Sequence, residues 1–398
     1  MNYYLMHKDI KVMELAFNSH GFVVDTGAIL NKEHLPLFVQ RNPDRIMLWM
    51  KERAIPNTRS GLKEFLEKLG EDSPQTLLLR NYGLSLTDCY WVKPLDSGLS
   101  WSDVNLFYND FTPIEMLYDH DAESLKGILK LSADSSLPGE LKKKWFIDEA
   151  GTRVLVKGNY GSGCQQSLNE ELGTLINAFQ NKMPFVTYRV SKYAFEGDDQ
   201  AFCCFSDNFV ESDSIELVHA WEVMALSAKN NNISAFQHYV NNCVKIGFKE
   251  NFIRDFLSYM IMLDYIMTNV DRHMGNLGIL RNPDTLEPIG MAPIYDCGNS
   301  MLYNQIFVKF NSKAVDKIDI NSFRKKEADM LGYIFNWGVF DINKLPSIGQ
   351  IKEIYAKDPG MNDRVDEILK CYQYKVNKLS GLQKRHGVNS DVGKEQDI

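Results

Sequence analysis

The chain has 398 residues, of which 44% are hydrophobic, and it carries a formal charge of −8. This length and hydrophobic content allow a large buried core divided between two domains or subdomains. The negative charge argues against sequence-independent binding to nucleic acid, which depends on neutralising phosphates with Lys and Arg. We therefore expect a globular protein that makes no direct contact with nucleic acid.

Export and membrane signals are missing from the sequence pattern. The first twenty residues lack a basic start followed by a long apolar run, and the most apolar later stretch, YMIMLDYIM, is interrupted by Asp264. The seven cysteines form no CxxC pair, which is typical of reduced and mostly buried thiols. His219 and His238 lack the spacing of a zinc site. These features predict a cytoplasmic protein without a membrane partner.

Residues 1–110 mix short apolar runs with helical segments, and their chemistry is anonymous. Leucine and phenylalanine recur at helical spacing in SGLKEFLEKLG, and Gly70 can end that helix. A Gly-, Ser- and Asp-rich segment at 96–105 follows. We place a boundary close to it and predict that residues 1–110 form an accessory subdomain of unknown role.

Strand-like patterns dominate residues 111–212, which we predict to be a first lobe. An apolar stretch from residue 127 leads into a Ser- and Gly-bearing loop, and WFI and VLV then form a hairpin that ends in Lys157. The stretch NEELGTLINAFQ has one apolar helical face, and FVTYRV and QAFCCF predict two more strands. The KKK run at 142–144 is interpreted as a solvated turn.

Residues 213–398 are predicted to form a mainly helical second lobe with a polar C-terminal tail. The helical pattern FIRDFLSYMIMLDYIMTN leads directly into DRHMGN, and a hairpin of LGIL and IGMAPIY follows. Asp296 then lies at a strand end, where Gly298 can permit a sharp departure. From Lys378 onward the chain is polar, and we expect it to be frayed. The whole pattern predicts an α+β protein.

Four residues have the side chains that phosphoryl transfer requires. That reaction needs the donor phosphates held, their charge neutralised by Mg²⁺ and an acceptor hydroxyl aimed in line. Asp271 and Asn276 are separated by four residues in a loop after a long helix, so both can face one cleft. Asp296 adds a second carboxylate and Lys157 adds a cation. The residue types and their order indicate a phosphotransferase that uses ATP and Mg²⁺.

The loop DRHMGN resembles the D-R-H-x-x-N catalytic loop shared by phosphatidylinositol kinase-like enzymes and the HipA family of bacterial serine/threonine kinases. The order SSLPGELKKKWFI, VLVKG, NEELGTLINAF, TNVDRHMGNLGIL and APIYDCGNS, over roughly residues 130–300, is more similar to the HipA family. This resemblance implies a two-lobed, protein-kinase-like α+β fold, with a small antiparallel sheet in a mixed first lobe and a helical second lobe.

Carried over to matching positions, the resemblance implies a catalytic group of Asp271, Arg272 and His273. Asp271 would be the base, Arg272 would pair with a carboxylate or a phosphate, and His273 would brace the loop. Asn276 and Asp296 would hold the metal, Mg²⁺.

The resemblance also implies an ATP site built from both lobes. Lys157 would bind phosphates with Glu170 as its partner, although the adjacent Glu171 is chemically equivalent. A loop at 137–142 would cover the phosphates, and 205–208 would lie near the adenine hinge. The residues expected to bind ATP are Ser136, Leu137, Pro138, Gly139, Lys157, Glu170, Phe205, Ser206, Asp207, Asn208, Asn276 and Asp296.

Two features concern the phosphate loop. In HipA-type kinases an inhibitory phosphate is placed on a loop serine that aligns with Ser136, and an added charge of about −1.5 to −2 would oppose ATP there. The chain has Gly139-Glu140-Leu141 where well-known members have Gly-Ala-Gln, and a glutamate facing the phosphates would be unfavourable. The stretch GNYGSG at 158–163 follows Lys157 instead of preceding it, and is interpreted as a flexible connection.

The leading hypothesis is an ATP-dependent serine/threonine protein kinase of toxin or self-phosphorylating type. The resemblance implies a protein substrate, for example a translation-related enzyme, and an antitoxin-like DNA-binding partner. A lipid or small-molecule kinase with the same loop is the alternative enzyme. A catalytically silent kinase fold with a regulatory role is the third hypothesis.

Overall fold

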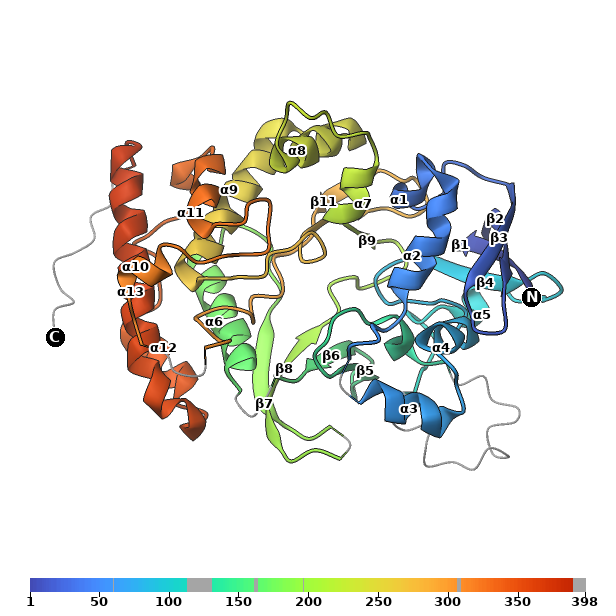
Figure 1. Cartoon of the computed structure of the whole chain (residues 1–398), viewed down its shortest axis with the longest axis horizontal. Helices are drawn as coiled ribbons and strands as arrows, with labels where there is room; N and C mark the ends of the chain where they lie inside the picture. The colour runs from blue at the N-terminus through green and yellow to red at the C-terminus, as the bar shows by residue number, and fades with distance from the viewer. Residues whose placement is uncertain (60, 113–130, 161–163, 196, 306–308, 389–398) are drawn as a thin grey trace.

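The computed structural model describes the chain except for residues 60, 113–130, 161–163, 196, 306–308 and 389–398 (Figure 1). Most of the apolar stretch predicted from residue 127, and the end of the GNYGSG stretch, lie outside the described residues. None of the described helices is long and apolar enough to cross a membrane.

Three antiparallel sheets organise the described strands. The first has the order β3-β2-β1-β4, the second β5-β6-β8-β7 and the third β11-β10-β9. Their strands are β1 (Asn2–His7), β2 (Ile10–Phe17), β3 (Val23–Ile29), β4 (Tyr90–Pro94), β5 (Lys143–Ile147), β6 (Arg153–Lys157), β7 (Tyr188–Tyr193), β8 (Ala201–Asp207), β9 (Glu216–His219), β10 (Gly278–Arg281) and β11 (Pro288–Met291).

Helices α6 and α9 to α13 lie at the opposite end of the molecule from the first sheet (Figure 1). The described α-helices are α1 (Leu37–Gln40), α2 (Ile46–Arg53), α3 (Leu62–Leu69), α4 (Pro74–Arg80), α5 (Trp101–Val104), α6 (Gln165–Gln180), α7 (Ala220–Ala225), α8 (Ala235–Ile246), α9 (Glu250–Met267), α10 (Ser312–Val315), α11 (Glu327–Met330), α12 (Ile348–Tyr355) and α13 (Asn362–Arg385).

Helix α9 is the centre of the helical lobe, where it packs against α8 and α13. Its side chains at Phe256, Tyr259, Met260 and Leu263 are buried, as their helical spacing predicts. The chain leaves the helix at Thr268, whose φ of 53° is left-handed. This buried helix therefore delivers the DRHMGN loop from a fixed position.

The first ~94 residues pack against the kinase-like part instead of standing apart. Met6 and Trp91 of the first sheet share a buried cluster with Leu137, Trp145 and Leu217 from the rest of the chain. Helix α1 also packs against α7. The domain limits near 110 and 212 stay predictions, but residues on the two sides of the first limit contribute to one core.

Several local predictions can be compared with the structure. Gly70 ends α3 with a φ of 66°, as predicted. The frayed tail is wrong as far as Arg385, because α13 continues to that residue and Lys378 pairs with Asp316 at 2.6 Å. The solvated turn at 142–144 is also wrong, since two of its three lysines lie in β5.

Candidate active site

Lys157 joins two carboxylates from distant parts of the chain. It is the last residue of β6, and its Nζ lies 2.7 Å from Glu170 Oε1 and 2.6 Å from Asp296 Oδ1. Glu170 lies on α6, and its other oxygen accepts a hydrogen bond from the backbone N–H of Cys297 at 2.8 Å. Glu171 contacts Lys357 instead. The two glutamates that the sequence left equivalent thus have different partners.

Burial and charge oppose each other within this group. Burial disfavours the charge of Lys157, but Asp296 and Glu170 raise its pKa well above the ordinary value. Burial also acts against the charge of Asp296, yet Lys157 and Lys143 lower its pKa. For Glu170 burial is the stronger effect and raises the pKa, although Lys157 opposes it. Lys157 and Asp296 are therefore a charged pair at neutral pH.

The backbone around Asp296 is unusual for a carboxylate residue. Asp296 itself has a φ of 58°, in the left-handed region that costs free energy for a residue with a side chain. The prediction that the chain turns sharply at Gly298 is therefore wrong, because the left-handed backbone lies at Asp296. Gly298 is needed for close packing, because a Cβ there would lie 3.2 Å from the carbonyl oxygen of Gln166.

Arg272 fixes the conformation of the DRHMGN loop through buried hydrogen bonds. It is only 2% exposed, and its guanidinium makes hydrogen bonds of 2.9 and 3.0 Å to the Asp264 carboxylate on α9. It also donates to the carbonyl oxygens of Asn276 and Tyr295. Burial disfavours its charge, but Asp264 raises its pKa well above the usual value. Arg272 therefore contacts a carboxylate, one of the two partners that the sequence allowed.

Asp271 is held at both of its carboxylate oxygens. Asn299 donates to Oδ2 at 2.9 Å, and Asn321 donates to Oδ1 at 3.1 Å. Asn276 donates from its amide to the backbone oxygen of Asp271 at 3.0 Å, and the ring Nδ1 of His273 accepts from the Gly275 N–H at 2.9 Å. Neither Asn299 nor Asn321 was found from the sequence, since neither belongs to the loop motif.

Asn276 and Asp296 have the donor atoms that a Mg²⁺ ion prefers. Asp296 Oδ2 and Asn276 Oδ1 accept no hydrogen bond from any described residue, while the other polar atoms of both side chains are engaged. Mg²⁺ binds carboxylate and amide oxygens and keeps several waters. The two free oxygens therefore fit such an ion.

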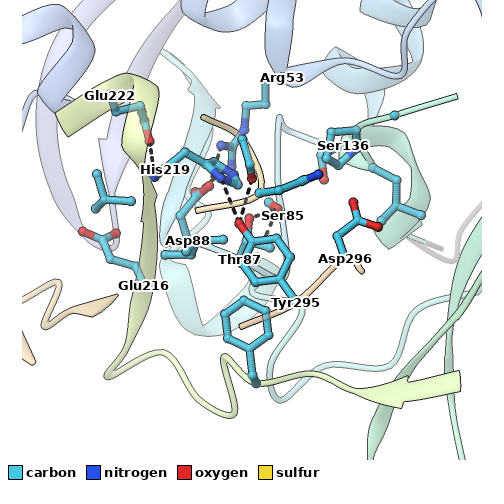
Figure 2. A pocket seen from close by; sticks show the side chains of 18 of the residues that line it. Arg53, Ser85, Thr87, Asp88, Ser136, Glu216, His219, Glu222, Tyr295 and Asp296 are labelled. Carbon is cyan, nitrogen blue, oxygen red and sulfur yellow. Dashed lines mark hydrogen bonds and ion pairs between the residues drawn. The ribbon is translucent and has the colours of Figure 1, made fainter. Parts of the chain in front are cut away.

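A cavity of about 670 Å³ opens beside these residues (Figure 2). Lys157, Asp296, Asn276 and His273 line one part of it, whereas Asp271, Arg272 and Glu170 do not. Residues 1–110 form a further wall, which the sequence did not predict, with Trp49, Arg53, Ser85, Thr87, Asp88 and Tyr90. The cavity thus lies between the kinase-like part and the first ~94 residues.

The predicted hinge residues divide between the two faces of their sheet. Ser206, Asp207 and Asn208 line the cavity. Phe205 does not, because its ring packs on the other face against Phe146. Strand alternation explains the difference between Phe205 and Ser206, whose side chains point to opposite faces of β8. Asp207 is the last residue of that strand, and its exposed carboxylate pairs with Arg189.

The predicted phosphate loop lies at the Asp296 end of the cavity. Ser136, Leu137, Pro138 and Gly139 all line it, as Asp296 does (Figure 2). Glu140 is exposed and is not among the lining residues, so it does not face the cavity.

Arg59 of the first ~94 residues supports this loop from outside. Its guanidinium donates to the carbonyl oxygens of Leu137, Pro138 and Gly139 at distances between 2.6 and 3.2 Å. Burial lowers the pKa of Arg59 to about 10, which leaves it charged at neutral pH. No motif in residues 1–110 could have pointed to this contact.

Lys143 is a second lysine beside Lys157 that the sequence reading missed. The two residues face each other in the β5–β6 ladder, and Lys143 lines the cavity. Burial, followed by repulsion from Lys157, lowers its pKa to about 7. The signal was available in the sequence, because aligning the predicted hairpin about its turn places these lysines opposite each other.

The solved structures that resemble the chain include one from a toxin–antitoxin complex and one of a kinase. A chain from the Shewanella oneidensis MR-1 toxin–antitoxin complex of HipA, HipB and operator DNA aligns over 100% of both chains, with a TM-score of 0.50 and 14% identity. The Helicobacter pylori proinflammatory kinase CtkA covers 62% of this chain and 97% of its own, with a TM-score of 0.44 and 16% identity. No protein-family model and no curated protein sequence matches the chain.

These comparisons define the class of fold. The full-length likeness to the HipA complex, together with a small antiparallel sheet and a helical second lobe, gives the chain a HipA-like, two-lobed kinase fold. The predicted fold class is confirmed. At 14% identity the likeness concerns the fold alone, so activity must be argued from the site.

Proposed function

We propose that the chain is a HipA-like, ATP-dependent serine/threonine protein kinase that transfers the γ-phosphoryl group to a protein hydroxyl. The observation that carries this proposal is the meeting of Lys157, Glu170 and Asp296 at one end of a cavity, next to the Asp271–Asn276 loop. Lys157 and Glu170 are separated from the loop and from Asp296 by more than a hundred residues in the chain. A purely structural turn at 271–276 would require none of the others.

Each residue has a physical role in this proposal. Lys157 binds the ATP phosphates, and Glu170 keeps its ammonium group in place. Asn276 and Asp296 hold Mg²⁺, which neutralises phosphate charge when bound. Asp271 accepts the proton of the acceptor hydroxyl and aims its oxygen. Its absence from the cavity lining fits this role, because the acceptor must approach from the side opposite the nucleotide.

Regulation and partners form the second part of the proposal. Ser136 lines the same cavity as Asp296 and Lys157, so a phosphate added there would repel ATP, and the chain would inhibit itself. The similar HipA was solved with HipB and operator DNA. By analogy we propose a DNA-binding antitoxin-like partner for this chain and a substrate among translation-related enzymes.

The test compares wild type with Lys157→Met in γ-labelled ATP and Mg²⁺. Each protein is incubated alone, with mixed protein acceptors and with phosphatidylinositol vesicles. Labelled phosphoserine or phosphothreonine in the wild-type samples alone would support the proposal. Labelled lipid without labelled protein would favour a lipid kinase, and a complete absence of transfer would contradict any kinase assignment.

A further inference from the structure

A chain of side-chain amides connects Asp271 to the segment that follows Lys157. The backbone N–H of Tyr160 donates to Gln166 Oε1 at 2.6 Å, and Gln166 Nε2 donates to Asn299 Oδ1 at 2.7 Å. Asn299 Nδ2 then donates to Asp271 Oδ2 at 2.9 Å. Three hydrogen bonds thus join the start of the GNYGSG stretch to the proposed base.

The two ends of this chain fix the orientation of both amides. A carboxylate only accepts hydrogen bonds, so Asn299 must present its NH₂ group to Asp271 and its oxygen to Gln166. Gln166 must then present its own NH₂ group to Asn299, and its oxygen faces the Tyr160 N–H, which can only donate. Neither amide can flip without placing two acceptors or two donors in contact. The arrangement is therefore directional.

Packing holds the residues of this hydrogen-bond chain close together. Gln166 is only 6% exposed and lies in the first turn of α6, four residues before Glu170. Gly298 allows residues 298–299 to approach that turn, because a Cβ at this position would lie 3.2 Å from the Gln166 carbonyl oxygen. Asn299 itself follows Asp296 by three residues. The chain of hydrogen bonds consequently joins elements that also carry the proposed ATP-binding groups.

We propose that Asn299 and Gln166 are positioning residues that orient the Asp271 carboxylate for phosphoryl transfer. This inference rests on the proposed kinase function. Asn299 holds one oxygen of Asp271 while Asn321 holds the other, which restricts rotation of the carboxylate. In-line transfer is sensitive to displacements of about 1 Å in the reacting groups. Gln166 acts only through Asn299 and touches neither base nor cavity.

The decisive variant is Gln166→Glu, which has nearly the same shape. The new carboxylate can still accept from the Tyr160 N–H but cannot donate to Asn299. The Asn299 amide should therefore flip and turn its oxygen toward Asp271, so that the carboxylate loses the donor that orients it. We expect kcat to fall about tenfold or more with an unchanged Kd for Mg·ATP. We also expect the KM for the protein acceptor to stay within about twofold of wild type, so that the loss falls on kcat.

Two further variants complete the design, each measured on the full chain with labelled ATP and a protein acceptor. Asn299→Asp should lower kcat in the same way, because it places a second carboxylate against Asp271, and it decides the matter if Gln166→Glu fails to fold. Asn304→Ala, an exposed asparagine nearby, should leave every readout unchanged.

The outcomes separate this inference from the proposed function. Folded Gln166→Glu and Asn299→Asp proteins with wild-type kcat would overturn the positioning role while leaving the kinase assignment intact. Weaker ATP binding with an unchanged kcat would also overturn it, since that result indicates general structural damage. An inactive wild-type protein would overturn both.

Discussion

The DRHMGN loop and the phosphate loop are supported in opposite ways. Arg272 anchors the first loop from a buried position, and its partners Asp264, Asn276, Tyr295 and Cys297 all belong to residues 213–398. The second loop is largely exposed at its tip. The only side chain outside 111–212 that the structure shows donating to its carbonyls, in the described part of the chain, comes from the remote Arg59.

The two loops of the cleft therefore differ in how rigidly the rest of the protein holds them. Proposed catalytic groups need fixed geometry, and buried charged hydrogen bonds provide it. A loop that covers a nucleotide must admit and release it, so weaker support is suitable there. The first ~94 residues then help to shape the proposed nucleotide site, even though they carry no recognisable catalytic motif.

The largest expected effect comes from disrupting the rigidly held DRHMGN loop. In Arg272→Met the Asp264 carboxylate loses its buried partner, and we expect the free energy of unfolding to fall by about 3–5 kcal/mol. Urea unfolding measures it. Arg80→Met is the matched control, because the Arg80–Glu71 pair is largely exposed on its arginine side and should contribute only about 0–1 kcal/mol. Equal losses in the two variants would show that Arg272 is no anchor.

A smaller effect is expected at the predicted phosphate loop. Arg59→Ala removes the donor shared by three carbonyl groups of the phosphate loop, and we expect Mg·ATP to bind about tenfold more weakly, or about 1.4 kcal/mol. Calorimetric titration of the full chain measures this change. Lys63→Ala, whose side chain is 91% exposed, should bind ATP as wild type does. Unchanged affinity in Arg59→Ala would remove the proposed link between residues 1–110 and the nucleotide.

The smallest effect concerns pH and Lys143. Because burial and Lys157 lower the pKa of Lys143 to about 7, its side chain is charged below pH 7 and mostly neutral above pH 8. Phosphates favour the charged form, so binding above pH 7 requires proton uptake and weakens by at most about tenfold per pH unit. We expect the Kd for Mg·ATP to rise by less than about tenfold between pH 6.5 and 8.5.

The Lys143→Arg variant tests the origin of that pH dependence. Arginine stays protonated throughout this range, so the affinity of the variant should change much less between pH 6.5 and 8.5. A variant whose Kd rises as steeply as that of wild type would assign the dependence to another group.

The sequence predicted the elements that depend on local patterns. The β5–β6 hairpin, α6 and α9 follow from turn residues and helical spacing, and the confirmed fold class follows from their order. Contacts between distant segments could not be predicted in this way. Arg59 meets the phosphate loop, and Asn321 meets Asp271, only because of tertiary packing. The prediction for Lys143 was wrong because a run of lysines usually indicates a solvated turn. Strand alternation across the hairpin instead places Lys143 opposite Lys157.

The most direct measurement is the rate of γ-phosphoryl transfer by wild type and Asp271→Asn at saturating Mg·ATP. The two side chains have nearly the same shape, and the asparagine cannot accept a proton. We predict a transfer rate about 10²- to 10⁴-fold lower for the variant, with Kd for Mg·ATP within about twofold of wild type. Equal rates of transfer in the two proteins would contradict the assignment of Asp271 and, with it, the proposed active site.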